Sequence, residues 1–185
     1  MARPRRALAL MLLAAPVPLA AQRAWPDAEL GRATLSFDGK SSLGGFTGVT
    51  TTVRGFMTGG PALTDVKGWV EAPVNTLKTG NDRRDRDLVK TMEAAIFANI
   101  RFELVGVQVT WERGDSAAVV LEGRFVIHGV SRAEKVPATL ARSNLGVHLR
   151  ADVPMNLHAY KVDNLTRFLV LKMQPDIVVH IDLAF

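Results

Sequence analysis

The 185-residue chain contains no cysteine. A disulfide framework, a thiolate metal site, a catalytic thiol and a lipid-modified cysteine are therefore excluded. Long hydrophobic runs are also missing, because none reaches the roughly 20 apolar residues that a membrane-spanning helix requires. What is present is a chain long enough to bury a substantial core without crosslinks, and its length favours a single domain.

The N-terminus has the layout of a secretory signal peptide. A basic stretch, an apolar stretch and a run of small residues follow one another in residues 1–21. The alternative, a membrane anchor, does not fit, since the apolar stretch is short and Pro16 and Pro18 interrupt its end. We predict cleavage after Ala21, a mature domain over residues 22–185, and a periplasmic location.

The leader also accounts for most of the net positive charge. The whole chain carries a formal charge of +5, and the leader holds three arginines and no acidic residue. The mature charge is therefore about +2, with basic and acidic residues interspersed. This composition predicts no nucleic-acid partner.

Alternation of apolar and polar residues with a period of two dominates the mature chain and is typical of half-buried β-strands. It is clearest in residues 117–128, 147–158 and 176–185. Shorter strands are expected at Ala33–Asp38, Thr47–Met57, Asp65–Asn75, Lys135–Ala141 and Phe168–Met173.

One expected strand changes phase. Between Ile100 and Glu112 the apolar residues fall first on even and then on odd positions. A single-residue slip inside a strand would turn every later side chain to the other face. We therefore predict a β-bulge or a turn near Leu104–Gly106.

One segment has a helical pattern instead. In Asp82–Phe97 the apolar residues Leu88, Met92 and Ile96 recur at four-residue spacing. Asp82 can cap this helix at its N-terminus, and Asp85 adds a favourable charge to the first turn. Many strands and a single short inserted helix predict an all-β fold, either a sandwich or a closed barrel of about eight strands.

Chemistry-bearing motifs are few. The four histidines show no metal-ligand spacing, and no G-x-S-x-G nucleophile elbow is present. We predict no metal site, no catalytic residue and no enzymatic activity. The charged run at the start of the helix is usually a solvated surface, but arginines and free amides there can also bind an anionic head group, with Asn81, Arg83 and Arg84 as the candidates.

Four motifs together identify a family. The sequence Thr79-Gly80-Asn81, followed by Arg84-Asp85 and Leu88, resembles a run found in YceI-like proteins of bacterial periplasms. Further similarities are Asn99-Ile100-Arg101-Phe102, the segment 121–130, and Phe37-Asp38-Gly39 with Gly45-Phe46-Thr47-Gly48. Near the C-terminus the family's R-x-D-F-G-like motif is replaced by residues 156–162, which contain no arginine.

The resemblance implies an extended, eight-stranded, antiparallel, lipocalin-like barrel that binds an isoprenoid lipid, such as a polyprenyl phosphate or a quinone, without another cofactor. A ligand-free module in envelope stress and an enzyme acting on lipid or sugar are the alternatives, and a homodimer is compatible with the sequence. The apolar strand faces fit either a packed core or an open lumen. The expected lumen residues are Phe37, Phe102, Leu121, Phe125, Val153, Met155, Leu157, Ile181 and Leu183.

Overall fold

A computed structural model describes residues 24–163 and 173–185. The strands are β1 (Ala28–Glu29), β2 (Arg32–Ser41), β3 (Gly44–Thr50), β4 (Arg54–Thr58), β5 (Lys67–Pro73), β6 (Asn99–Arg113), β7 (Ser116–Ile127), β8 (Val130–Ser143), β9 (Gly146–Asn156) and β10 (Asp176–Ala184). The helices are α1 (Asp82–Thr91) and the 3₁₀ turns η1 (Leu63–Asp65), η2 (Val74–Thr76) and η3 (Leu157–Tyr160).

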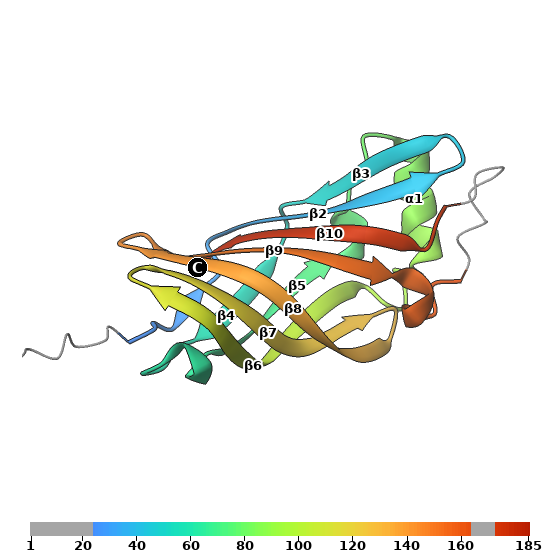
Figure 1. Ribbon diagram of the computed structural model, residues 1–185. Coiled ribbons are helices and arrows are strands. Elements are labelled where there is room, and N and C mark those ends of the chain that lie inside the picture. The colour runs from blue at the N-terminus through green and yellow to red at the C-terminus, as the bar shows by residue number, and fades with distance from the viewer. Residues whose placement is uncertain (1–23, 164–172) are drawn as a thin grey trace, which may run out of the picture.

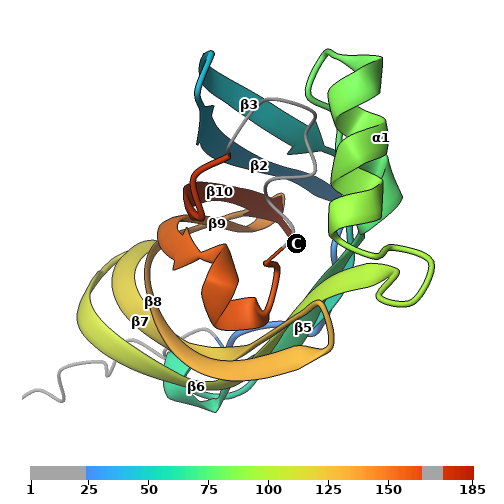
Figure 2. The ribbon, with the colours of Figure 1, turned by 90° about the vertical axis from the view of Figure 1, so that its right-hand side faces the viewer.

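The ten strands form one strongly curled antiparallel sheet in the order β1-β4-β5-β6-β7-β8-β9-β10-β2-β3. Figure 1 shows the elongated shape that this sheet gives to the molecule, with α1 beside β2 and β3 at one end. Seen from that end, the sheet wraps around a central axis (Figure 2). The predicted all-β architecture with one short α-helix is confirmed.

The difference between ten strands and the expected eight has a simple cause. β1 and β2 belong to one long chain segment that pairs with the segment containing β3 and β4, from Glu29 opposite Phe56 to Leu35 opposite Thr50. Between these pairs the two segments separate, which divides each of them into two strands and raises the count from eight to ten. On their other sides, β2 pairs with β10 and β4 pairs with β5. The single strand predicted at Thr47–Met57 is therefore wrong, since residues 51–53 interrupt it.

The predicted bulge in β6 is confirmed. The register of β6 against β7 shifts between Leu104 and Gly106, where Val105 is the extra residue. Beyond the bulge Val107 points inward and is buried. A second shift follows between Val109 and Trp111, and both side chains are substantially exposed.

The helix is shorter than the sequence pattern predicts. α1 ends at Thr91, because Glu93 adopts a left-handed backbone with φ of 46°. Ile96 therefore lies in a turn and is exposed rather than part of the apolar stripe. The N-cap is Asn81 and not Asp82, since the Asn81 side chain accepts a hydrogen bond from the Arg84 amide. The predicted strand Phe168–Met173 lies outside the described residues except for Met173, which bridges to Ser41.

The alternation of apolar and polar residues places the core on the concave face of the sheet. In β7 and β9 the odd-numbered apolar residues point to the concave face of the sheet and are mostly buried. Within the described residues, no helix has both the length and the apolar character needed to cross a membrane. The concave face therefore collects most of the apolar side chains of the domain.

Candidate ligand-binding site

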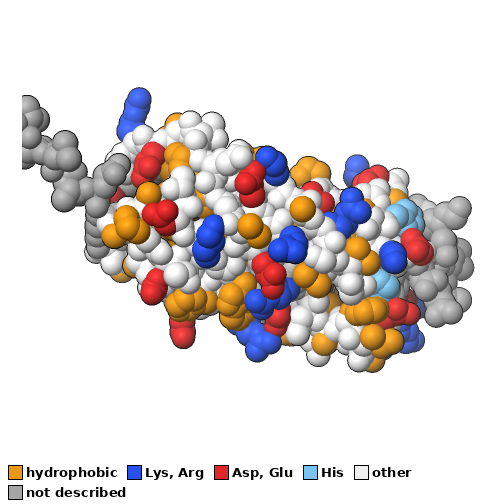
Figure 3. Space-filling view, turned by 90° about the horizontal axis from the view of Figure 1, so that it is seen from below, with side chains coloured by type: hydrophobic (Ala, Val, Ile, Leu, Met, Phe, Trp, Pro, Cys, Tyr) orange, Lys and Arg blue, Asp and Glu red, His pale blue; other side chains and the backbone are white. Residues whose placement is uncertain are grey.

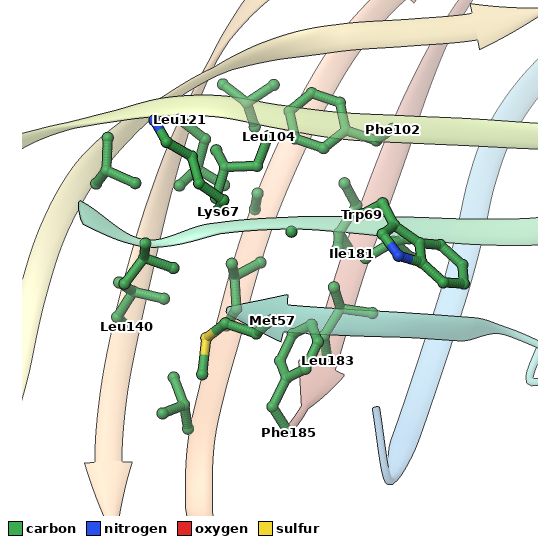
Figure 4. Close-up of a pocket in the computed structure, with 18 of the residues that line it drawn as sticks. Met57, Lys67, Trp69, Phe102, Leu104, Leu121, Leu140, Ile181, Leu183 and Phe185 are labelled. Atoms are coloured by element: carbon green, nitrogen blue, oxygen red, sulfur yellow. The ribbon is translucent and has the colours of Figure 1, made fainter. Parts of the chain in front are cut away.

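The concave face of the sheet surrounds two apolar cavities. The first chamber, of about 130 Å³, lies between β4, β5, β6 and the C-terminal half of β10 (Figure 4). The second chamber, of about 120 Å³, lies beneath α1 and the β2–β3 hairpin. Five residues line both chambers and form a waist between them: Leu35, Ala72, Ile100, Phe125 and Val179.

The two chambers lie one after the other on the concave face and share the five waist residues, and together they are called the channel. The inward residues of β10 run from Ile177 in the second chamber, through Val179 at the waist, to Phe185 in the first. At about 3.3 Å per residue this stretch spans roughly 26 Å. On the first-chamber side of the waist, the ring of Phe102 is tilted against that of Phe125, with centroids 4.7 Å apart. The shape suits a long, narrow ligand.

The lining is apolar over nearly its whole length. In the second chamber the hydroxyl of Thr50 is paired with that of Thr76 at 2.7 Å. Among the described residues that line the chambers, each chamber has one charged side chain. It is Lys67 in the first chamber and Arg84 in the second. A polar group of a ligand would lose its hydrogen bonds to water inside the channel, at a cost of about 1–3 kcal/mol. A head group therefore belongs at one end.

The two charged residues are held differently. The Lys67 stem follows the wall, and its ammonium donates to the carbonyl of Val105 at the β6 bulge. Arg84 is fixed by Thr79, whose hydroxyl and carbonyl accept from Nε and Nη2, both at 2.9 Å. Its guanidinium carbon lies 4.4 Å from the ring centroid of Phe46. Arg84 is thus the more rigidly positioned cation.

Asp85 anchors the turn that precedes α1. Its carboxylate accepts from the Thr79 amide at 2.8 Å and from the Thr79 hydroxyl at 2.6 Å. Burial would raise the pKa of Asp85, but the hydrogen bonds from Thr79, assisted by the positive charges of Lys78 and Arg84, lower it overall. The motif Thr79-Gly80-Asn81 thus shapes the entry into the helix, with Gly80 at φ of 73°.

The structure brings most of the predicted lumen residues to the channel. Val153 is the exception, because it is buried but lines neither chamber. The first chamber receives Phe102, Leu121, Phe125, Ile181 and Leu183, and the second receives Phe37, Phe125, Met155 and Leu157.

Among the three head-group candidates only Arg84 lines the channel. The side chain of Asn81 caps the helix and that of Arg83 is exposed, so the geometry does not bring the three together. Sequence reasoning also missed the wall made by β4 and β5. Neighbouring residues there, such as Phe56 and Met57 or Trp69 and Val70, all line the first chamber, so no clean alternation marks them.

The segment that replaces the family's late motif closes one side of the second chamber. Leu157, the first residue of the 3₁₀ turn η3, and Val162, which follows that turn, both line the chamber. Tyr160 is almost fully buried, and desolvation together with the nearby carboxylate of Glu134 raises its pKa to about 12. This segment therefore contributes apolar surface to the chamber and no cation.

The histidines lie apart from the channel. His148 and His180 pair with carboxylates on the outer face of the sheet, and His158 pairs with Asp163. His128, expected on a strand face, instead lies in the β7–β8 turn against Phe97. Within the described residues no cluster of acids and histidines could hold a metal ion. On the face shown in Figure 3, basic and acidic side chains are mixed.

The profile of the YceI-like domain matches residues 29–185 of this sequence. The chain belongs to the YceI-like family. A comparison with curated proteins finds no match.

Solved structures share the fold. BcnA of Burkholderia cenocepacia matches with a TM-score of 0.70 at 13% identity, covering 83% of this chain and 96% of BcnA. A polyisoprenoid binding domain from Saccharophagus degradans, implicated in plant cell wall breakdown, matches with a TM-score of 0.69 at 15% identity, covering 84% and 95%. A Campylobacter jejuni YceI protein matches with a TM-score of 0.57 at 18% identity, covering 73% and 81%.

Proposed function

We propose that this YceI-like protein binds an isoprenoid-type lipid, a polyprenyl phosphate or a quinone, and stores or transports it in the channel. The observation that carries the proposal is the apolar lining of two chambers that share five waist residues. Each CH₂ group that leaves water contributes about 0.8 kcal/mol, so a long tail gains much from such a channel. A distant relative of the same fold is described as a polyisoprenoid binding domain. The proposed role is binding and not catalysis.

The head group of the ligand lies at the α1 end in this proposal. Arg84 presents a guanidinium to the second chamber, fixed by Thr79 and stacked on Phe46. A planar, preorganised guanidinium suits a phosphate or a quinone carbonyl better than a mobile ammonium does. Lys67 marks the opposite end of the channel, where the tip of the tail would lie.

The site of action is the periplasm, after export and cleavage following Ala21. The basic, apolar and small-residue parts of residues 1–21 support this proposal. Mass spectrometry of the protein from the periplasm of a Gram-negative host checks it. A mature chain that begins at Gln22 is expected, and retention of the protein in the cytoplasm would contradict export.

Native mass spectrometry of the mature protein tests the main proposal. We expect lipid adducts on protein purified from its own envelope, and uptake of geranylgeranyl phosphate or a long-chain quinone by delipidated protein. A protein that carries no lipid and takes up neither probe would show that the binding proposal is wrong and would favour a ligand-free interaction module.

The position of the head group is tested by two matched variants. Arg84→Gln should reduce the preference for geranylgeranyl phosphate over geranylgeraniol, whereas Lys67→Gln should leave that preference unchanged. The opposite result would place the head group at the Lys67 end. Comparing a charged and an uncharged probe separates a head-group effect from a general loss of lipid binding.

A further inference from the structure

The β2–β3 hairpin contains two reciprocal pairs of phenylalanine and glycine. Phe37 stands directly opposite Gly48, and Gly39 stands opposite Phe46. Both rings line the second chamber, and they meet edge to face with centroids 6.0 Å apart. Each ring lies over the glycine of the opposite strand, so the two rings form a wall that follows the hairpin.

The closeness of this packing depends on the missing side chains. A Cβ atom at Gly48 would lie 2.2 Å from Cε1 and 2.5 Å from Cζ of the Phe37 ring, and a Cβ at Gly39 would lie 2.7 Å from Cζ of Phe46. Real Cβ atoms essentially never approach a neighbour this closely. Any residue other than glycine at position 48 therefore forces the Phe37 ring off its present position.

The surroundings of Phe37 restrict the direction in which its ring can move. Phe37 is only 8% exposed and points to the concave side of the sheet. The edge of Phe46 blocks one side, and the β3 backbone lies behind the ring. The remaining space is the second chamber itself, which the ring already lines.

We propose that the Phe37–Gly48 pair sets the depth of the second chamber and thereby limits the length of the single isoprenoid chain that the channel holds. The inference rests on the proposed lipid-binding function. A ring seated on glycine leaves the chamber open, whereas a ring lifted from its seat fills it and confines an uncharged prenyl chain, which has no anionic head group for Arg84 to bind, to the first chamber.

The waist carries a related arrangement that is less suitable for a test. A Cβ at Gly123 would lie 2.3 Å from the ring of Phe102 but also 2.5 Å from the carbonyl oxygen of Glu103. A substitution there would disturb the sheet backbone as well as the ring. At Gly48 the close atoms all belong to the Phe37 side chain, so that position separates channel shape from backbone damage.

Binding of a short and a long prenyl alcohol tests the proposal. Farnesol is short, whereas solanesol is far longer than either chamber. We expect Gly48→Ala to weaken solanesol binding by about tenfold or more while farnesol binding changes by less than about twofold. Gly45→Ala in the same strand is the matched control, because the nearest atom to a Cβ there is a carbonyl oxygen at 3.8 Å.

A double variant separates channel shape from stability. Removing the ring in Gly48→Ala/Phe37→Ala should restore solanesol binding, even though deleting a buried phenyl ring lowers stability by about 3–5 kcal/mol. If Gly48→Ala does not fold, Phe37→Trp puts a larger ring on the intact glycine, and the same selective loss of solanesol is expected.

The outcomes distinguish the two proposals. Unchanged solanesol binding in a folded Gly48→Ala protein, or equal loss of both alcohols, would overturn the role of the Phe37–Gly48 pair while lipid binding by the wild type stands. Failure of the wild type to bind either alcohol would instead overturn the proposed function, and this inference with it.

Discussion

Arg84 donates two hydrogen bonds to Thr79, from Nε to the side-chain hydroxyl and from Nη2 to the main-chain carbonyl, each 2.9 Å long. The six residues 79–84 are thereby closed into a rigid corner at the start of α1. The same guanidinium borders the second chamber. One side chain thus holds the entry into α1 and borders the chamber for which we propose lipid binding, and both roles can be measured.

The stability role is tested by Arg84→Ala. Loss of two hydrogen bonds from a charged donor should lower the free energy of unfolding by about 1.5–3 kcal/mol. Urea denaturation followed by circular dichroism measures the change. Arg83→Ala is the control, because Arg83 is exposed on the same helix, and a shift within about 0.5 kcal/mol is expected. Equal effects of the two variants would contradict the Thr79 anchor.

Asp85 gives the protein an acid-dependent contribution to stability. Because its pKa is lowered in the folded state, its ionised form stabilises the fold above the ordinary value of 3.8, and this contribution is lost as the pH falls through the lowered pKa. Asp85→Ala should therefore be destabilising at neutral pH, by about 1–3 kcal/mol, and the difference from wild type should shrink in strong acid.

Urea titrations at neutral and acidic pH measure this difference. Asp82→Asn is the matched control, because Asp82 is an exposed carboxylate in the same first turn. It should change stability by no more than the roughly 0.3–1 kcal/mol of a helix-dipole interaction. A difference for Asp85→Ala that is constant with pH would contradict the role of its charge.

His180 should make stability fall as the pH rises above the ordinary histidine value of 6.5 and through its raised pKa. Its Nδ1 lies 2.6 Å from a carboxylate oxygen of Asp152 and its Nε2 lies 3.1 Å from one of Asp38, so the protonated ring can donate to both and link β9, β10 and β2 on the outer face. The hydrogen bond with Asp152, and then that with Asp38, raise its pKa above 6.5. A raised pKa contributes stability that is present below the unfolded value and is lost as the pH rises through the folded value.

Thermal unfolding of wild type and His180→Gln across this range checks the sign. The wild type should melt at a higher temperature on the acidic side of 6.5, and the two curves should converge as the pH rises. Because the group is largely solvated, the effect should be small and should weaken in high salt. Convergence in acid instead of in base would refute the assignment.

A charge in the channel should not be tolerated. Leu121 is buried in the wall of the first chamber. Leu121→Lys therefore places an ammonium in a chamber that none of the described carboxylates lines. In urea denaturation we expect either that unfolding is no longer cooperative or that the free energy of unfolding falls by several kcal/mol. Val120→Lys on the outer face of the same strand is the control, with a change within about 0.5 kcal/mol. Similar behaviour of both variants would show that Leu121 does not face the interior.

Much of the sheet could be predicted because its signal is local. The alternation in residues 117–128, 147–158 and 176–185 identified three long strands and the inward face of each. The phase change near Leu104 located the bulge, since a strand with one buried face cannot slip by one residue without exposing its core side. The motif at Thr79–Asp85 located the helix entry, but its arginine and aspartate fulfil roles that only the fold explains.

The predictions that were wrong concern features that the local sequence pattern does not determine. The break at residues 51–53 arises because one hairpin pairs with two different parts of the sheet, a condition set by partners distant in sequence. The end of α1 at Thr91 depends on the backbone of Glu93, which interrupts an otherwise continuous apolar stripe. Val153 has the right phase for the lumen and is buried, yet it lines neither chamber.

The sequence by itself determined the class of fold, the inward faces of the long strands and membership of a family, because each rests on patterns within short stretches of chain. Only the tertiary structure decided whether those faces enclose a filled core or an open channel. That outcome depends on cross-strand register, which places Phe37 over Gly48 and beside Val179, and register joins residues that are far apart in the sequence.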